Sequence, residues 1–157
     1  MTLKGVPSSI SPELLYVLAK MGHGDLLVIA DSNFPSDSTA SKTINRVPIR
    51  VNINSTADLL RDILTLIPLD TYSLTPVSVM DRVASDKERN LIVPAYESIL
   101  SVINQDSDMD SDTTSNIFGL TYVDRFEFYE QAKHAFCVVQ TADCTPYANI
   151  IISKGVP

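Results

Sequence analysis

The run LLVIA at residues 26–30 is the stretch of this 157-residue chain that decides its fold class. Five consecutive apolar, mostly branched residues between polar neighbours are typical of a strand that is buried on both faces, as in a parallel sheet. Asp31 follows directly and closes the run. The stretch therefore predicts a buried strand with a carboxylate at its carboxyl end.

Helical patterns lie on both sides of this strand. The first begins at Ser11-Pro12-Glu13, because a capping hydroxyl, a proline and an acidic residue all suit a first turn, and Gly22 offers a left-handed stop. Apolar residues at helical spacing predict further helices at residues 56–67 and 125–135. A capping box at residues 85–88 starts a segment that is helical in character as far as residue 102, with an interruption near Pro94.

Runs rich in branched and aromatic residues predict the remaining strands, at residues 47–53, 74–83, 118–123, 136–141 and 148–153. The last two are joined by ADCTPY (142–147), which predicts a hairpin or another tight connection, and the polar segment 32–45 is expected to be a long surface loop. Helices and strands alternate throughout. We therefore expect an α/β fold with a mixed central sheet, in a single domain that spans residues 1–157.

Composition and charge exclude several classes of protein. The chain has 12 basic and 19 acidic residues, which gives a formal charge of −7. This negative charge argues against nucleic acid or an anionic membrane as the main partner. No window approaches the length of a membrane span, and the first ten residues lack the apolar core of a signal peptide. Cys137 and Cys144 are expected to be free thiols in a reducing compartment, so the predicted location is the cytoplasm.

The acidic charge is concentrated in the segment 104–116, which holds Asp106, Asp108, Asp110 and Asp112 and no basic residue. The spacing of these carboxylates resembles a calcium-binding loop. Such a loop requires glycine where this chain has Ser111, and a bidentate glutamate where it has Ile117. We therefore expect a variable, solvated acidic loop rather than a calcium site.

Two chemically versatile residues flank the strand at 26–30. His23 stands in a glycine-flanked turn before it and is suited to proton transfer near neutral pH, whereas Asp31 closes it. An extended strand of five residues separates them by about 16 Å. They can share one site only if the turn folds back or if a neighbouring subunit completes the site. The alternative is that His23 only helps to end the preceding helix and Asp31 only binds nearby amides.

Tyr147 and Asn149 are spaced i, i+2 at the start of the last predicted strand, which would point both side chains to one face. Polar groups on one face of a strand end can orient a ligand with several hydroxyl groups. The alternative is a tyrosine packed at the sheet edge beside an asparagine in a turn. The chain contains no glycine-rich phosphate loop, no nucleophile elbow and no metal-ligand pattern.

Four motifs, taken together, resemble the L-fucose mutarotase family, which is related to the D-ribose pyranases. They are SPELLYVLAKMGHGD (11–25), IADSNFP (29–35), RFEFYEQAKHAF (125–136) and YANIIISKGV (147–156). The resemblance runs in order from Leu3 to Val156. One departure is Ala148, where relatives have glycine, a small change that leaves the residues on either side of it in place.

This resemblance implies an enzyme that interconverts the α and β anomers of L-fucose without cofactor or metal. It implies a three-layer α/β/α fold and a homo-oligomer with sites between subunits, which would resolve the separation of the two residues that flank the first strand. It assigns catalytic roles to His23 and Tyr129, and substrate-binding roles to Asp31, Asp70, Met80, Arg125, Tyr129, Tyr147 and Asn149. Two other functions stay open: pyranose–furanose interconversion of D-ribose, and a non-catalytic sugar-binding module.

Overall fold

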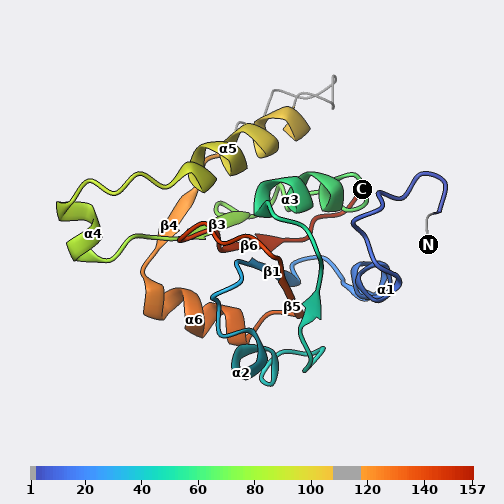
Figure 1. Ribbon diagram of the computed structural model, residues 1–157. Coiled ribbons are helices and arrows are strands. Elements are labelled where there is room, and N and C mark those ends of the chain that lie inside the picture. Colours follow the sequence, from blue (N-terminus) through green and yellow to red (C-terminus); the bar gives the residue numbers. More distant parts are fainter. Residues whose placement is uncertain (1–2, 108–117) are drawn as a thin grey trace.

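Six strands form one mixed sheet in the computed structural model, which describes residues 3–107 and 118–157 (Figure 1). The strand order is β2-β5-β1-β6-β3-β4. The strands are β1 (Leu26–Ala30), β2 (Ile49–Arg50), β3 (Val77–Met80), β4 (Thr121–Val123), β5 (Cys137–Gln140) and β6 (Ile150–Ser153). The helices are α1 (Pro12–Lys20), α2 (Ser36–Ala40), α3 (Thr56–Leu64), α4 (Ala84–Glu88), α5 (Pro94–Ser107) and α6 (Arg125–Lys133).

The sheet is parallel except for β6. Strand β5 pairs in parallel with β1 and β2, and β3 pairs in parallel with β4. Strand β6 lies between β1 and β3 and runs antiparallel to both. The carboxyl ends of the five parallel strands therefore meet one edge of the sheet, together with the start of β6, and this edge is called the carboxyl edge below.

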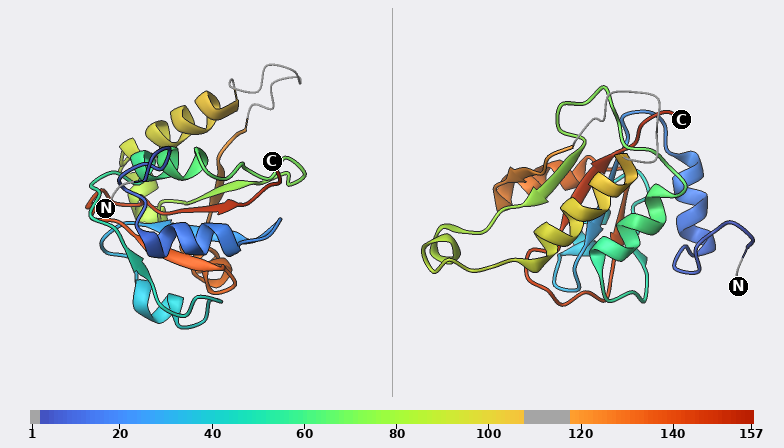
Figure 2. Two further views of the ribbon diagram at one scale, coloured as in Figure 1. Left: turned by 90° about the vertical axis from the view of Figure 1, so that its right-hand side faces the viewer. Right: turned by 90° about the horizontal axis from the view of Figure 1, so that it is seen from above.

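Helices cover both faces of the sheet, as Figure 2 shows. Helices α1, α3 and α5 share one apolar cluster with Leu27 and Ile29, whereas α2 and α6 enclose a second cluster with Val28 and Ala30. This alternation confirms that β1 is buried on both faces. The α/β class with a mixed central sheet, in three α/β/α layers, is likewise confirmed. Helix α4 buries none of its residues and projects away from the layers (Figure 1).

Local capping signals were predictive at some helix ends and not at others. Ser11 Oγ accepts a hydrogen bond from the amide N of Leu14 at 3.2 Å, as predicted for the start of α1. Gly22 is not the left-handed stop. Instead Lys154 Nζ donates to the carbonyl oxygens of Leu18 and Met21, at 3.2 and 2.5 Å, and so satisfies the end of the helix. No such signal is visible in the sequence around Gly22, because the lysine comes from the far end of the chain.

The predicted capping box at residues 85–88 is wrong. Helix α4 begins after Val83, which makes no side-chain cap, and it ends at Glu88. The interruption predicted near Pro94 is confirmed, because α5 starts at that proline, which suits the first turn of a helix. Residues 104–107 of the predicted acidic loop belong to α5, and the rest of that segment lies outside the described residues.

The segment 32–45 is not simply a surface loop. It contains α2, and Phe34, Thr39 and Ala40 are buried in it. The polar composition concealed this, because Ser36 and Thr43 satisfy their hydroxyl groups on nearby carbonyl oxygens and can therefore be buried. The segment packs α2 against β5 and α6.

The predicted hairpin between the last two strands is also wrong. Strand β6 does run antiparallel to β5, but β1 lies between them, so residues 142–147 pass the end of β1 and the two strands do not pair. Several strands are shorter than predicted; β2, for example, keeps only Ile49 and Arg50 of residues 47–53. The ends of a strand are set by its pairing partners rather than by composition. None of the described helices is long and apolar enough to span a membrane.

Gly155 lets the end of the chain pass close to the segment that carries Asp70. A Cβ at Gly155 would lie 2.3 Å from the carbonyl oxygen of Leu69 and 3.1 Å from the Cα of Asp70. The amide N of Gly155 donates to the carbonyl oxygen of Pro68 at 2.8 Å, so the two segments are held together. The position therefore requires the absence of a side chain.

We expect Gly155→Ala to lower the free energy of unfolding by about 1–3 kcal/mol, because the backbone of residues 69–70 must shift. Denaturant unfolding followed by circular dichroism measures this. Gly119→Ala is the matched control, because a Cβ at Gly119 meets nothing within 4 Å, and its effect should stay within about 0.5 kcal/mol. Equal effects of the two substitutions would contradict the role of the close approach.

Candidate active site

The predicted site residues fall into two groups at opposite edges of the sheet. One group lies at the carboxyl edge, where β1, β3 and β4 end, α6 follows and β6 begins. Its members are Asp31, Met80, Arg125, Tyr129, Tyr147 and Asn149. In α/β sheets this is the edge where ligands bind. His23 and Asp70 lie at the other edge, where β1 begins and β6 ends.

Asp31 and Asn149 form a two-point pair at the carboxyl edge. The amide N of Asp31 donates to Asn149 Oδ1 at 2.9 Å, and Asn149 Nδ2 donates to Asp31 Oδ2 at 2.8 Å. Both side chains are buried. Burial raises the pKa of the Asp31 carboxyl, and the hydrogen bonds from Asn33 and Asn149 oppose that effect only in part. Asn149 thus orients the carboxylate that the sequence placed at the end of the strand.

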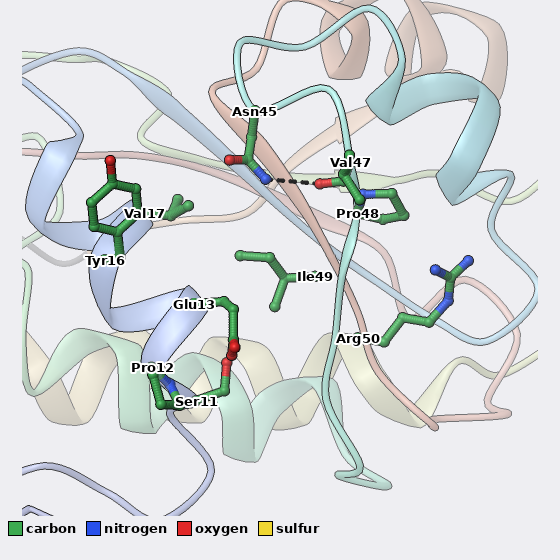
Figure 3. A pocket seen from close by; sticks show the side chains of 10 residues that line it. All are labelled: Ser11, Pro12, Glu13, Tyr16, Val17, Asn45, Val47, Pro48, Ile49 and Arg50. Carbon is green, nitrogen blue, oxygen red and sulfur yellow. Dashed lines mark hydrogen bonds between the residues drawn. The ribbon is translucent and has the colours of Figure 1, made fainter.

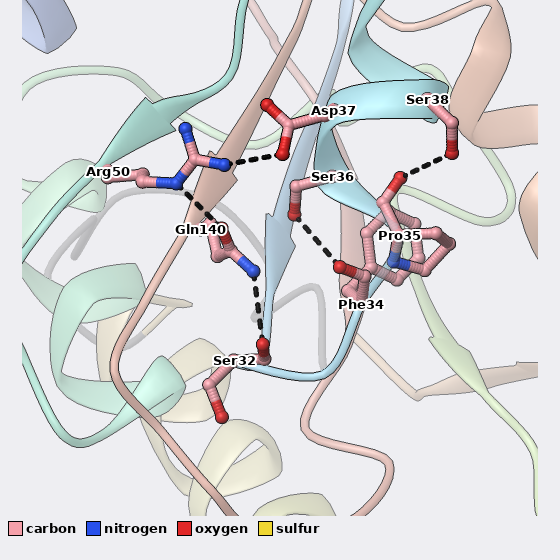
Figure 4. Close-up of polar contacts among 8 residues, drawn as sticks. All are labelled: Ser32, Phe34, Pro35, Ser36, Asp37, Ser38, Arg50 and Gln140. Carbon is pink, nitrogen blue, oxygen red and sulfur yellow. Dashed lines mark hydrogen bonds and ion pairs between the residues drawn. The ribbon is translucent and has the colours of Figure 1, made fainter.

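The turn after Asp31 is fixed to the neighbouring strands, as Figure 4 shows. The carbonyl oxygen of Ser32 accepts a hydrogen bond from Gln140 Nε2 at 3.2 Å, and Gln140 Oε1 accepts one from Arg50 Nε at 3.1 Å. Arg50 also pairs with Asp37 of α2 at 2.7 Å. These contacts join β5, β2 and α2 to the turn. The Asp31 carboxylate is therefore held on an anchored loop and not on a free one.

Aromatic side chains line the same edge on the α2–α6 face of the sheet. Tyr129 of α6 packs edge-on against Phe34, with ring centroids 5.6 Å apart. Tyr129 and Tyr147 both pack against the apolar cluster that contains Met80. Three of the predicted residues are thus brought together, and Phe34, which lies in the segment predicted to be a surface loop, supports Tyr129.

Tyr147 does not occupy the strand position that the spacing suggested. It lies in a turn with φ of 63°, and β6 begins only at Ile150. Such a left-handed conformation is uncommon for a residue with a side chain. The i, i+2 argument for Tyr147 and Asn149 is therefore wrong in its geometry, although both residues are at the predicted edge.

The Tyr147 hydroxyl has two protein partners. It donates to Asp86 Oδ2 of α4 at 2.6 Å and accepts from the amide N of Val83 at 3.2 Å. Burial raises the pKa of Tyr147 and the Asp86 carboxylate raises it further, whereas the charge of Arg125 acts in the opposite direction. Sequence reasoning missed Asp86, because no motif marks a carboxylate 61 residues away from its partner.

Arg125 begins α6 and brings a positive charge to the carboxyl edge. Its Nε is buried and meets no hydrogen-bond partner within residues 3–107 and 118–157. Its guanidinium carbon lies 5.1 Å from the centre of the Phe126 ring. A buried donor without a partner is costly, so this nitrogen is available to a ligand with an accepting oxygen.

His23 and Asp70 form an ion pair at the opposite edge. His23 Nε2 lies 3.0 Å from Asp70 Oδ1, and the histidine side chain is 45% exposed while that of Asp70 is 9% exposed. Asp70 also accepts hydrogen bonds from the amide N of Tyr72, at 3.0 Å, and from Ser153 Oγ, at 3.4 Å. The ring of Tyr72 meets the imidazole edge-on at 5.7 Å. Asp70 therefore fixes the orientation of His23.

This pair assigns the roles of the two imidazole nitrogens. An ionised carboxylate can only accept, so Nε2 carries a hydrogen and Nδ1 is the nitrogen left for proton exchange. A histidine held by a buried carboxylate and open to solvent on its other side is suited to general acid–base chemistry. His23 thus has a carboxylate partner in addition to its place after the preceding helix, whereas His134 is exposed at the end of α6.

A separate groove of about 700 Å³ lies between α1 and β2 (Figure 3). It is lined mainly by apolar groups of α1 and of residues 45–50, and Asn45 Nδ2 donates to the carbonyl oxygen of Val47 beside it, at 2.8 Å. It contains none of the predicted site residues, so it is not part of the candidate site. Within the described ranges no three His, Cys, Asp or Glu side chains are grouped so that they could hold a metal ion.

Comparisons with known proteins find extensive similarity. A model of the RbsD / FucU transport protein family matches residues 4–157. The fucose mutarotase of Homo sapiens is 44% identical over 154 residues, which are 98% of this chain and 94% of the human protein. The L-fucose mutarotase of Histophilus somni is 40% identical over 98% of this chain and 96% of its own. The crystal structure of the fucose mutarotase from Streptococcus pneumoniae in complex with L-fucose has a TM-score of 0.82 and 37% identity, and 99% of each chain is covered.

The His23–Asp70 pair leads to a prediction about ionisation. The hydrogen bond from His23 holds the pKa of Asp70 below its ordinary value of 3.8, against the effect of burial. We expect His23→Ala to raise this pKa, which carboxyl-carbon NMR titration measures. Because the pKa of Asp70 is lower in the folded protein than in the unfolded chain, its carboxylate stabilises the fold above about pH 4. This stabilisation is lost as the pH falls through the folded-state pKa. The free energy of unfolding should therefore fall more on acidification in the wild type than in the variant.

Asp143 is the internal control for this titration. Backbone hydrogen bonds from Thr56 and Thr145 hold its pKa below the ordinary value against the effect of burial, and it makes no contact with His23. Its pKa should be the same in both proteins. An unchanged pKa of Asp70 in the variant would show that the pair does not control that carboxyl group.

Proposed function

Because this chain belongs to the RbsD / FucU family, we propose that it is a fucose mutarotase, which interconverts the α and β anomers of L-fucose. The observation that carries this function is the His23–Asp70 pair, an oriented acid–base group in a chain 44% identical to a fucose mutarotase. The proposed enzyme consists of a single domain over residues 1–157. Its proposed location is the cytoplasm.

Anomer exchange requires the sugar ring to open and close. The bond between C1 and the ring oxygen breaks, the aldehyde turns about one bond, and the ring closes on the other face of the carbonyl group. Opening is faster when one group protonates the ring oxygen while another removes the proton of the anomeric hydroxyl. Both protons return on closure, so the chemistry proposed here runs entirely on side-chain acids and bases.

The proposed roles follow from the contacts of each residue. His23 donates and retakes the ring-oxygen proton through Nδ1, because Asp70 occupies Nε2. At the carboxyl edge the Asp31 carboxylate, held by Asn149, accepts hydrogen bonds from sugar hydroxyl groups, and the free Nε of Arg125 donates to a sugar oxygen. Three further residues complete this half of the site, with apolar or phenolic contacts to the sugar: Met80, Tyr129 and Tyr147.

The separation of the two groups supports a homo-oligomer. Strand β1 has five residues, so His23 and Asp31 are about 16 Å apart along the sheet, which exceeds the size of a monosaccharide. One sugar can meet both groups only where the edge with His23 of one copy faces the carboxyl edge of another. We therefore propose that each active site lies between two subunits.

The activity is tested by saturation-transfer NMR on the anomeric protons of L-fucose and, in parallel, of D-ribose. We expect faster exchange of L-fucose with the wild-type protein, and a loss of about 10²- to 10⁴-fold with His23→Ala, because the proton donor is removed. His134→Ala is the control, since that histidine is exposed on another element, and it should keep the wild-type rate. Binding of the sugar without faster exchange would contradict the enzyme and favour a binding module.

The shared site is tested by complementation. His23→Ala and Asp31→Ala are each expected to be nearly inactive, because the first loses the acid and the second loses the carboxylate that holds the sugar hydroxyl groups, and the two groups lie at opposite edges of the sheet. Subunits mixed at equal amounts and reassembled should regain about a quarter of the wild-type exchange rate, because one random pairing in four contains both intact edges. A mixture that stays as inactive as its parts would show that each site belongs to one chain.

A further inference from the structure

Asp86 makes a contact that packing does not explain. It belongs to α4, whose five residues are all unburied, in the excursion that projects from the layers in Figure 1. Its carboxylate nevertheless reaches back to the carboxyl edge and accepts the hydroxyl proton of Tyr147, with 2.6 Å between the oxygen atoms. The side chain of Asp86 is only 15% exposed as a result. The contact thus joins an exposed helix to a residue of the candidate site.

The hydrogen bonds of Tyr147 restrict what its hydroxyl can do for a ligand. A phenol has one hydrogen and two lone pairs. The hydrogen is directed to Asp86 and one lone pair accepts the amide hydrogen of Val83, at 3.2 Å. One lone pair is left, so Tyr147 meets a sugar as a hydrogen-bond acceptor. An acceptor is what the anomeric hydroxyl needs when it loses its proton.

The backbone of Tyr147 adds an independent observation. Its φ of 63° is a conformation that residues with a side chain rarely adopt, and such strain is concentrated at functional sites. The conformation aims the ring so that the hydroxyl reaches Asp86 and Val83 while the ring packs against both apolar clusters. The structure therefore fixes both the ring of Tyr147, through its backbone and packing, and its hydroxyl group, through two hydrogen bonds.

The charge of Asp86 is maintained by its surroundings. Hydrogen bonds from Tyr147 and Arg89 hold the pKa of this carboxyl below its ordinary value, and the charge of Arg82 acts in the same direction. The groups that face Tyr147 are Asp86 from α4, Arg125 from α6 and Tyr96 from α5. Asp86 is thus an ionised carboxylate at neutral pH, and it takes up the phenolic hydrogen only as the phenol receives another proton.

We propose that Asp86 is a positioning residue for the mutarotase reaction: it presents Tyr147 as the acceptor of the anomeric proton and takes up the phenolic hydrogen as the ring opens. The inference rests on the proposed function and names the base of that reaction. It concerns the half of the site at the carboxyl edge, whereas His23 supplies the acid from the other edge.

The proton transfers balance within this arrangement. The O1–H proton passes to the Tyr147 oxygen while the tyrosine's own hydrogen passes to Asp86 Oδ2, and the electron pair left on O1 forms the C1=O1 double bond. The electrons of the C1–O5 bond stay on O5, which takes a proton from the His23 imidazolium. The products are the open-chain aldehyde, a neutral Asp86 and a neutral imidazole. Closure on the other face returns both protons, and no electrons are exchanged with any other molecule.

The test compares Asp86→Asn with the wild type in L-fucose exchange. The amide can still accept the tyrosine hydrogen, so the geometry is kept, but it does not take up a proton near neutral pH. We expect kcat to fall about 10- to 100-fold and KM to change less than about threefold. Asp58→Asn is the matched control, because Asp58 also pairs with an arginine three residues on but lies on α3, and it should exchange at the wild-type rate.

Dependence on pH separates proton transfer from a structural effect. Removing the Asp86 charge takes away one cause that raises the pKa of Tyr147, so the phenol of the variant ionises at lower pH and becomes a base itself. The ratio of variant to wild-type kcat should therefore rise between about pH 7 and 10, after the spontaneous rate is subtracted. A ratio that stays constant with pH would contradict the proposed role.

A double-mutant cycle shows whether Asp86 acts through Tyr147. In a Tyr147→Phe background, Asp86→Asn should cost less than twofold, because the phenol that it serves is gone. The proposal is overturned if Asp86→Asn retains the wild-type kcat, or if its cost is the same in both backgrounds. Failure of the proposed function is a different result, in which the wild-type protein itself does not accelerate L-fucose exchange.

Discussion

The antiparallel strand β6 is the element on which the rest of the structure depends. It pairs with β1 on one side and with β3 on the other, and so joins two parallel groups of strands into one sheet. Because β6 runs against its neighbours, its start meets their carboxyl ends and its end meets their amino ends. Asn149 therefore orients Asp31 at one edge, while Ser153 reaches Asp70 at the other. A single short strand thus organises both groups of site residues.

This arrangement has a direct consequence for the proposed chemistry. The acid at His23 and the polar groups around Asp31 are separated by the length of β1, and no side chain can span that distance. In the proposed mutarotase the sheet is a rigid spacer between the proposed acid and the proposed sugar-binding groups, which are brought together by the association of subunits proposed above. In the single chain the side chain of His23 is 45% exposed, so the proposed acid can be reached from outside.

Local patterns predicted a large part of this molecule. The strand at 26–30 has the predicted bounds, because five apolar residues between polar ones define it locally. The helix that starts at Pro12 begins where its cap indicates, and the helix predicted from apolar spacing at 125–135 begins at Arg125. Errors arose where distant residues decide local structure. Lys154, not Gly22, satisfies the carbonyl oxygens at the end of the first helix. Strand β1 lies between the two strands for which a hairpin was predicted.

The sequence by itself determined the fold class, the family resemblance and the identity of most candidate site residues, because periodicity, caps and motifs are properties of neighbouring residues. Only the tertiary structure decided how those residues are used. It directs the Asp70 carboxylate to His23, turns Asn149 toward Asp31 and brings Asp86 to Tyr147. These partners are separated by 47, 118 and 61 positions in the chain. Contacts at such separations depend on strand order and direction, which hydrogen bonding between strands sets and no local pattern encodes.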